Sequence, residues 1–308
     1  MNVLIIGLGS IAKKHIIAFR SIALDFKIFA LRSSVNVEEF EDVINIFDLC
    51  DDTLIFDFAI ISNPTHLHYQ YIELLTKTST PLFIEKPAVH KLDKVDELLH
   101  LVSEKKLTTY VACNLRFHPC LMFLKNKLNS EKSRVNELNV YCGSYLPDWR
   151  SGEDFKKNYS ANASMGGGVH LDLFHELDYV TWLFGFPDSS YAIIRSVSSL
   201  AINAADYANY ILQYETFTAS IELNYYRRKP KREIEIVFED TTWTVNLIKN
   251  TIKDDCGILL FEARDFSISE TYRSQLNYFI DCLKNNIKPM NSLQESIPVL
   301  EICLKNEK

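Results

Sequence analysis

The chain has 308 residues, 47% of them hydrophobic and 24% charged, which is the composition of a folded protein long enough for two domains. Its formal net charge of −7 argues against a nucleic-acid-binding protein that neutralises phosphates, and no apolar run approaches the roughly 18 residues of a membrane helix. The seven cysteines form no CxxC pair, so we expect buried, reduced thiols. No basic residue precedes the apolar start of the chain, so we expect no signal peptide and a cytoplasmic protein. Glycines are scarce, nine in all, and five of them fall in two clusters, Gly7/Gly9 and Gly166–Gly168.

The first third of the chain alternates apolar strands with helix-length segments. We expect strands at 3–6, 27–31, 57–61, 81–84 and 109–113, and helices following Gly9, from Thr65 to about 75 and from about 92 to 105. Residues 35–50 show no clear pattern. This alternation predicts βαβ units and an α/β domain with a parallel sheet.

A G-x-G-x-x-A turn follows the first predicted strand and opens a helix. Gly7 allows a tight turn, Gly9 allows close approach of a pyrophosphate, and Ala12 allows close packing of helix on strand. The backbone N–H groups around Ser10 and Ile11 would point at the phosphates. The turn therefore predicts a dinucleotide site, with a strand–turn–helix connection that binds no ligand as the alternative.

The end of the second predicted strand carries no carboxylate for an adenosine ribose. It reads Leu31-Arg32-Ser33-Ser34, and the first acidic residue is Glu38. Arg32, Ser33 and Ser34 suit a 2′-phosphate, so we expect NADP(H) to be favoured over NAD(H). The alternative is a solvated surface arginine.

Two more motifs come directly after predicted strands, where open α/β sheets bind ligands. They are Ser62-Asn63-Pro64 and Glu85-Lys86-Pro87. Lys86, held at the crevice near a nicotinamide, suits hydrogen bonding to a substrate hydroxyl and transfer of its proton. The alternative is a salt-bridged surface lysine.

After Pro119 the pattern changes, and we place a domain boundary near residue 118. A helix is expected at 120–127, a strand at 135–143, a long loop at 144–165 and a helix at 171–184. Successive strand-like runs at 191–197, 207–214, 217–226, 233–239 and 242–247 predict a mostly antiparallel sheet in an α+β domain. Helices are expected near 270–285 and 291–305.

The second glycine cluster leads into a group of histidines and carboxylates. Asp172 and His175, and likewise His175 and Asp178, are three residues apart and would share a helix face. Such pairs suit general acid–base chemistry, with the glycines admitting a substrate to the backbone. The alternatives are an ordinary helix pair or a metal site that includes His170; we expect no metal, because a clear ligand set is lacking.

Four motifs in this order give the chain a family resemblance: the Gly7/Gly9/Ala12 turn, Glu85-Lys86-Pro87, Asn114-x-Arg116-Phe117-x-Pro119, and the glycine run followed by Asp172, His175 and Asp178. Together they resemble the Gfo/Idh/MocA family of NAD(P)-dependent sugar and cyclitol oxidoreductases. The resemblance covers essentially the whole chain. It implies a doubly wound Rossmann domain at 1–118 and a substrate-binding domain at 119–308 with a large open sheet. It also allows the last helices to return to the first domain.

The resemblance also implies residue roles. It makes Lys86 catalytic, with Asp172 and His175 assisting proton transfer and holding the sugar. His68, Asn114 and Arg116 would lie beside the cofactor, with Ser62, Asn63, Pro64 and Glu85. Lys86 and Arg116 would also contact the substrate. Family members often form oligomers through the open sheet, so we expect a homodimer or homotetramer.

The chain departs from the family pattern near the proposed pocket. Asp172 and His175 are separated by three positions where the family usually has four, and Phe174 replaces a glycine. The segment 145–161 resembles a subgroup associated with bacterial surface-carbohydrate pathways. Within it, Tyr145, Trp149, Arg150 and Tyr159 suit sugar stacking and anion pairing, the alternative being a structured surface loop.

These observations predict hydride transfer between nicotinamide and a secondary hydroxyl or ketone of a sugar, cyclitol or nucleotide sugar. A non-catalytic NAD(P)-binding sensor or scaffold is the alternative, and an enzyme acting on an imine or an unsaturated pigment is a third possibility. Neither a nucleic acid nor a membrane is an expected partner.

Overall fold

We describe the chain from a computed structural model, and the description covers residues 1–22, 24–35, 39–49, 54–130, 133–150, 152 and 154–306. The chain divides into two compact units. The first unit comprises Met1–Asn114 and Ser267–Ile297, and the second comprises Leu115–Phe266 and Pro298–Lys308. The first division therefore falls shortly before residue 118, and the chain returns to the first unit late in the sequence.

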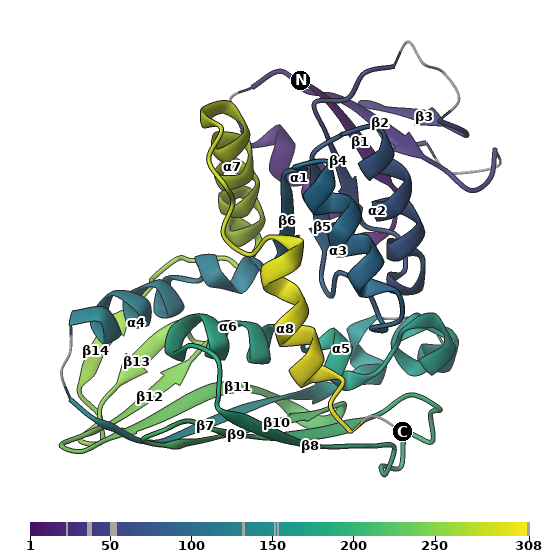
Figure 1. Cartoon of the computed structure of the whole chain (residues 1–308). Helices are drawn as coiled ribbons and strands as arrows, with labels where there is room; N and C mark the ends of the chain where they lie inside the picture. The colour runs from purple at the N-terminus through teal and green to yellow at the C-terminus, as the bar shows by residue number, and fades with distance from the viewer. Residues whose placement is uncertain are drawn as a thin grey trace. The chain divides into compact units, whose positions relative to one another are not determined.

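A six-stranded parallel sheet forms the first unit, in the order β3-β2-β1-β4-β5-β6 (Figure 1). Its strands are β1 (Asn2–Ile6), β2 (Lys27–Leu31), β3 (Val43–Ile46), β4 (Phe58–Ile61), β5 (Leu82–Glu85) and β6 (Thr109–Ala112). The central strands are apolar and buried because helices cover both faces. The predicted Rossmann sheet is confirmed, with β3 arising from the stretch that showed no pattern.

The helices of this unit include one from far along the chain. They are α1 (Ser10–Arg20), α2 (His68–Lys77), α3 (Val95–Glu104) and α7 (Ser269–Asn285), with a 3₁₀ turn, η1 (Thr65–Leu67), before α2. In Figure 1, α1 and α7 lie side by side, as do α2 and α3. Phe279 of α7 packs its ring against Phe58, Phe83 and Tyr110 of three neighbouring strands.

An eight-stranded sheet forms the second unit, in the order β14-β13-β12-β11-β7-β10-β9-β8. Its strands are β7 (Val135–Tyr145), β8 (Ser189–Arg195), β9 (Tyr207–Gln213), β10 (Thr218–Asn224), β11 (Tyr226–Phe238), β12 (Thr242–Asn246), β13 (Thr251–Lys253) and β14 (Leu259–Glu262). All neighbours are antiparallel except β7 and β10. The mostly antiparallel sheet is confirmed, but β11 begins earlier than predicted, and β13 and β14 were not predicted.

Helices lie over one face of this sheet (Figure 1). They are α4 (Pro119–Ser130), α5 (Val169–Asp172) and α6 (His175–Phe184), while α8 (Leu293–Cys303) spans the division between the units. The described residues of the predicted loop contain four 3₁₀ turns, η3 (Leu146–Trp149), η4 (Phe155–Lys157), η5 (Tyr159–Ala161) and η6 (Ala163–Met165). The continuous helix predicted at 171–184 is wrong, because Leu173 leaves helical geometry (φ −97°, ψ 31°) and separates α5 from α6.

The cysteine expectation holds for most of the described thiols. Five are buried, but Cys256 is exposed in the turn between β13 and β14. Cys50 lies outside the described residues.

Candidate functional site

Three loops of the first unit leave the same edge of the sheet. Gly7 follows β1, Ser62 follows β4, and Lys86 follows β5; these strands are adjacent and parallel. The chain starts at β1, runs outward to β2 and β3, and returns to β4 on the other side of β1. The β1/β4 pair is therefore the topological switch point, where open α/β sheets bind ligands.

The Gly7–Gly9 turn is built for close approach of backbone. Gly7 has φ +80°, and a Cβ there would lie 2.9 Å from the Cβ of Asn63, so glycine is required. A Cβ on Gly9 would meet nothing within 4 Å, which leaves open space over the turn. Ser62 Oγ donates a hydrogen bond to Ile6 O at 3.2 Å and ties the two loops together.

Helix α1 begins directly after this open space. Its hydrogen bonding starts with Lys13 N–H donating to Gly9 O at 3.1 Å, so the N–H groups of Ser10, Ile11 and Ala12 precede the helical ladder. The first turn of α1 contains no acidic residue. A helix N-terminus of this kind favours an anion such as a pyrophosphate.

Asn63 provides an independent indication of a ligand. Its side-chain Oδ1 and Nδ2 are both buried, and neither has a hydrogen-bond partner among the described residues. A buried amide normally finds a partner. The space over Gly9 and the unpartnered amide of Asn63 therefore fit a dinucleotide.

The proposed 2′-phosphate residues lie at the end of β2. Ser33 and Ser34 are exposed, and Arg32 is half-buried. The Arg32 guanidinium donates to Asn45 Oδ1 at 3.0 Å, which anchors it beside β3. Glu38 lies outside the described residues.

The structure gives protein partners to two side chains that were expected to touch the cofactor. Glu85 is 8% exposed, and its Oε1 lies 2.6 Å from Nε2 of His15, a buried residue that the motifs did not indicate. His68 is 1% exposed, and both its ring nitrogens face backbone carbonyls. Both side chains thus have hydrogen-bond partners within the protein, and their expected place beside the cofactor stays a prediction. Lys86 itself is half-buried.

Asn114 and Arg116 also have hydrogen-bond partners within the protein. Asn114 Nδ2 donates to Thr271 Oγ1 at 2.7 Å in the first unit. In the second unit Arg116, 7% exposed, donates through Nε and Nη2 to the two carboxylate oxygens of Asp178, at 2.9 and 2.7 Å. Arg116 and Asp178 thus hold each other through two charge-assisted hydrogen bonds. The roles expected of Asn114 and Arg116 toward a ligand, and of Asp178 toward His175, stay predictions.

Asp172 and His175 lie on different helices, at the end of α5 and the start of α6. Both are half-buried. The helix-face argument for pairing them therefore fails. Asp172 Oδ2 accepts a hydrogen bond from the hydroxyl of Tyr225, at 2.5 Å. The negative charge of Asp172 is also the main cause that raises the pKa of Tyr159.

Aromatic and basic side chains surround this carboxylate. The Trp149 ring packs edge-on against Tyr225, with centroids 5.3 Å apart, and its Nε1 donates to Ser144 Oγ. The Arg150 guanidinium lies 5.5 Å from the centre of the Tyr159 ring. Trp149, Arg150 and Tyr159 thus gather near Asp172. The fourth predicted loop residue, Tyr145, is covered by Arg228, whose guanidinium lies 3.7 Å from the centre of the Tyr145 ring.

Tyr225 and His15 are residues that the sequence motifs missed. Tyr225 follows strand β10 within a Tyr-Tyr pair, and nothing in that local pattern distinguishes a core tyrosine from a carboxylate partner. His15 occupies an apolar face of α1, where a histidine is ambiguous by sequence.

The second glycine cluster has a structural explanation. Gly166–Gly168 are buried, and Gly166 has φ +77°. A Cβ on Gly167 would lie 2.0 Å from Tyr159 O, and one on Gly168 would lie 2.6 Å from the His170 ring. The space beside Gly167 and Gly168 is thus filled by the chain itself, and approach of a substrate to this glycine run stays a prediction.

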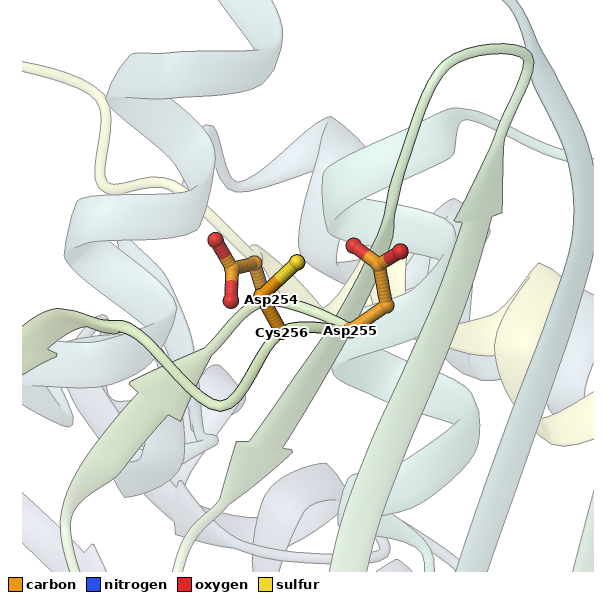
Figure 2. Close-up of side chains that lie close together, drawn as sticks. All are labelled: Asp254, Asp255 and Cys256. Atoms are coloured by element: carbon orange, nitrogen blue, oxygen red, sulfur yellow. The ribbon is translucent and has the colours of Figure 1, made fainter.

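One group of three potential metal ligands occurs among the described residues. Asp254, Asp255 and Cys256 lie together in the exposed turn between β13 and β14 (Figure 2). Asp254 Oδ1 accepts from Ile258 N–H at 2.8 Å, and Asp255 Oδ1 accepts from Thr241 Oγ1 at 2.9 Å. These hydrogen bonds hold both carboxylates within the turn. The group does not include His170, Asp172 or His175.

No helix in the described part of the chain has the length and apolar character to cross a membrane.

Both units of the chain resemble known protein domains. Residues 1–113 match the model of the oxidoreductase family with the NAD-binding Rossmann fold, and residues 132–244 match the GFO/IDH/MocA C-terminal domain. Among curated relatives, the chain is 27% identical over 139 residues to an uncharacterised oxidoreductase of Synechocystis, covering 45% of this chain. It is 25% identical over 130 residues to inositol 2-dehydrogenase of Rhizobium meliloti, covering 42% of this chain. In both cases the match spans 37% of the relative's length.

Solved structures extend the likeness across the chain. A levoglucosan dehydrogenase in complex with NADH and levoglucosan superposes with a TM-score of 0.84 at 15% identity, covering 98% of this chain and 95% of the other. A UDP-N-acetylglucosamine 3-dehydrogenase from Acidithiobacillus ferrooxidans superposes with a TM-score of 0.76 at 18% identity, covering 99% of this chain and 95% of the other. The two family models together match more than half of the chain. The chain therefore belongs to the Gfo/Idh/MocA family of oxidoreductases, with an NAD-binding Rossmann domain and the family's C-terminal domain.

Proposed function

We propose that the chain is an NAD(P)-dependent dehydrogenase or reductase that transfers a hydride between nicotinamide and a secondary hydroxyl or ketone of a sugar, cyclitol or nucleotide sugar. One observation carries the proposal: the open space over Gly9, the unpartnered amide of Asn63 and the half-buried Lys86 belong to adjacent loops at the switch point. The first two suit the cofactor, and the third places an amine at the next strand end.

The redox chemistry would come from the nicotinamide, while the chain orients the substrate and handles its proton. In the oxidising direction, Lys86 with His175 would accept the proton of the hydroxyl as its carbon loses a hydride. In the reducing direction, they would return that proton to the carbonyl oxygen. Asp172, oriented by Tyr225, would accept hydrogen bonds from substrate hydroxyls.

The second unit supports a polyhydroxylated substrate. Trp149 is 38% exposed and packs against Tyr225, the tyrosine that donates to Asp172. A partly exposed aromatic ring beside a carboxylate suits a sugar. The related dehydrogenases named above act on inositol, levoglucosan and UDP-N-acetylglucosamine by their descriptions. We therefore favour a ring with several hydroxyls over an imine or a pigment.

Arg32, Ser33 and Ser34 support a preference for NADP(H). The arginine is anchored through Asn45 near two exposed serines, an arrangement that suits a 2′-phosphate. Titration of cofactor fluorescence would compare the two nucleotides, and we expect Arg32→Ala to weaken NADPH binding much more than NADH binding. Tighter binding of NADH by the wild type would overturn the preference.

We further propose a homodimer or homotetramer formed through the open sheet of the second unit. Light scattering coupled to size-exclusion chromatography measures the mass directly, and a monomer at micromolar concentration would contradict this assembly.

The decisive test of function is turnover. NADPH absorbance at 340 nm, a property of the cofactor, would be followed with a panel of keto-sugars, keto-cyclitols and nucleotide keto-sugars. We expect Lys86→Ala to keep cofactor binding and to lower kcat at least about 100-fold. Lys91→Ala, at an exposed lysine nearby, is the control. Cofactor binding without turnover on any substrate would favour the non-catalytic sensor.

A further inference from the structure

The loop that carries Lys86 is held by buried groups on both sides. Lys86 is half-buried, whereas Glu85 before it and Pro87, Ala88 and Val89 after it are buried. Two histidines from different helices contact this segment, His15 of α1 and His68 of α2. Neither is needed for the proton transfer proposed above.

His15 connects the loop to the helix that follows the glycine turn. Its side chain is fully buried, and its Nε2 lies 2.6 Å from Glu85 Oε1. The other carboxylate oxygen, Glu85 Oε2, accepts the backbone N–H of Lys86 at 3.3 Å. The rings of Phe83 and Tyr272 pack edge-on against the imidazole, at 5.1 and 5.7 Å. The backbone of Lys86 is thereby linked through one carboxylate to α1.

His68 connects the same loop to the other cofactor loop. Its Nε2 lies 2.9 Å from Asn63 O, and its Nδ1 lies 3.1 Å from Pro87 O and 3.2 Å from Ala88 O. A neutral imidazole carries one N–H and can donate to one side, while an imidazolium donates to both. Burial lowers the pKa of His68, and the carbonyls of Asn63, Pro87 and Ala88 and the charge of Glu85 oppose that effect.

We propose that His15 and His68 are positioning residues for Lys86, tying its loop to the two loops that would hold the cofactor. The inference rests on the proposed role of Lys86. Because a displacement of about 1 Å in a reacting group costs on the order of 100-fold in rate, a loop fixed at two points matters for turnover. The same two links would transmit the ordering of the Gly7–Gly9 and Ser62–Pro64 loops by a bound cofactor to Lys86.

The first experiment needs no substrate. Reductive methylation of the amines, quantified by mass spectrometry, would give the labelling rate of Lys86 relative to exposed Lys94 of the same chain. We expect His15→Asn and His68→Asn to raise this ratio about threefold or more, because the loop opens more often. His15→Gln, whose amide nitrogen reaches the Nε2 position, should restore the wild-type ratio. His100→Asn, at an exposed histidine of α3, is the control.

An unchanged ratio in folded His15→Asn and His68→Asn would overturn the inference, whether or not a substrate is known. Folding is checked by circular dichroism and by NADPH binding. If His15→Asn is unstable, the labelling ratio of His68→Asn against wild type still decides.

The second experiment applies once turnover is found. We expect His15→Asn and His68→Asn to lower kcat roughly 10- to 100-fold while the KM for the substrate changes less than about threefold. Rescue of kcat by His15→Gln would support positioning. Equal kcat in all the variants and the wild type would contradict a positioning role for His15 and His68. A wild-type chain that binds no cofactor would instead refute the proposed function.

Discussion

The carboxylate of Asp172 accepts a hydrogen bond from a tyrosine that no sequence motif includes. Tyr225 is fully buried, and its hydroxyl donates to Asp172 at 2.5 Å. Burial and the charge of Asp172 raise the pKa of Tyr225, so the phenol stays protonated and remains a donor. The orientation of the proposed sugar-binding carboxylate thus depends on a residue outside every motif.

We expect Tyr225→Phe to lower kcat/KM about tenfold, the usual cost of one hydrogen bond to a charged group. The free energy of unfolding should fall only modestly. Tyr210→Phe is the matched control, because its buried hydroxyl donates to Cys303 O at 2.8 Å in the same unit. Steady-state kinetics would be compared with urea unfolding for both. An equal loss of kcat/KM in the two variants would show that Tyr225 has no specific role.

His118 gives a prediction about pH and stability. It is 1% exposed, its Nδ1 accepts the N–H of Cys120, and its Nε2 faces Asn250 Oδ1, so the folded state holds a neutral ring. Burial lowers the pKa of His118 to about 4, from 6.5. The unfolded chain therefore takes up a proton first, and the stability from neutral His118 is complete above pH 6.5 and is lost as the pH falls toward 4.

We expect this loss to reach about 3 kcal/mol by pH 4. In His118→Gln the free energy of unfolding should decline less steeply between pH 7 and pH 4, even if the variant is less stable at pH 7. Urea unfolding at several pH values measures the slope, with His100→Gln as an exposed control. Identical slopes in His118→Gln and wild type would rule out this contribution.

At the scale of elements, the two glycine clusters differ in what fills the space beside them. The space over Gly9 is open, whereas the space beside Gly167 is occupied by the carbonyl of Tyr159. We expect Gly9→Ala to leave the free energy of unfolding unchanged and to weaken NADPH binding at least about tenfold, because the methyl takes the place of the pyrophosphate. Gly167→Ala should instead destabilise the chain by roughly 1–3 kcal/mol or more. Urea unfolding and cofactor titration of both variants would distinguish the two roles, and a destabilised Gly9→Ala would contradict this assignment.

The sequence predicted the elements whose signals are local. β1, the glycine turn and α1 are indicated by an apolar run, Gly7, Gly9 and Ala12, all within one short stretch. The break between α5 and α6 was missed, because Leu171, Leu173 and Leu177 keep an apolar pattern through it. Side-chain partners were missed for a similar reason: the Arg116–Asp178 pair joins residues 62 positions apart, which no local pattern reports.

At the scale of the whole molecule, sequence order and spatial order diverge. Strand β10 pairs in parallel with β7 although the predicted succession of strands implied antiparallel neighbours. Helix α7 belongs to the first unit although it lies within the predicted second domain at 119–308, whose last helices the family resemblance allowed to return. Both features depend on contacts across more than 70 residues, so their formation is set by tertiary packing.

The late return of the chain makes the first unit dependent on residues near the C-terminus. Phe279 of α7 is fully buried, and its ring contacts Phe58, Phe83 and Tyr110 of three sheet strands. We expect Phe279→Ala to lower the free energy of unfolding by about 3–5 kcal/mol, since it leaves a cavity against the sheet. The loss should appear as faster proteolysis within residues 1–114 and a lower melting temperature. Saturating NADPH should recover about 3 kcal/mol of it at 100 times the Kd, because the cofactor binds only the folded unit. Phe186→Ala, at an exposed phenylalanine, is the control. Proteolysis of Phe279→Ala at the wild-type rate would show that the first unit does not depend on the packing of α7.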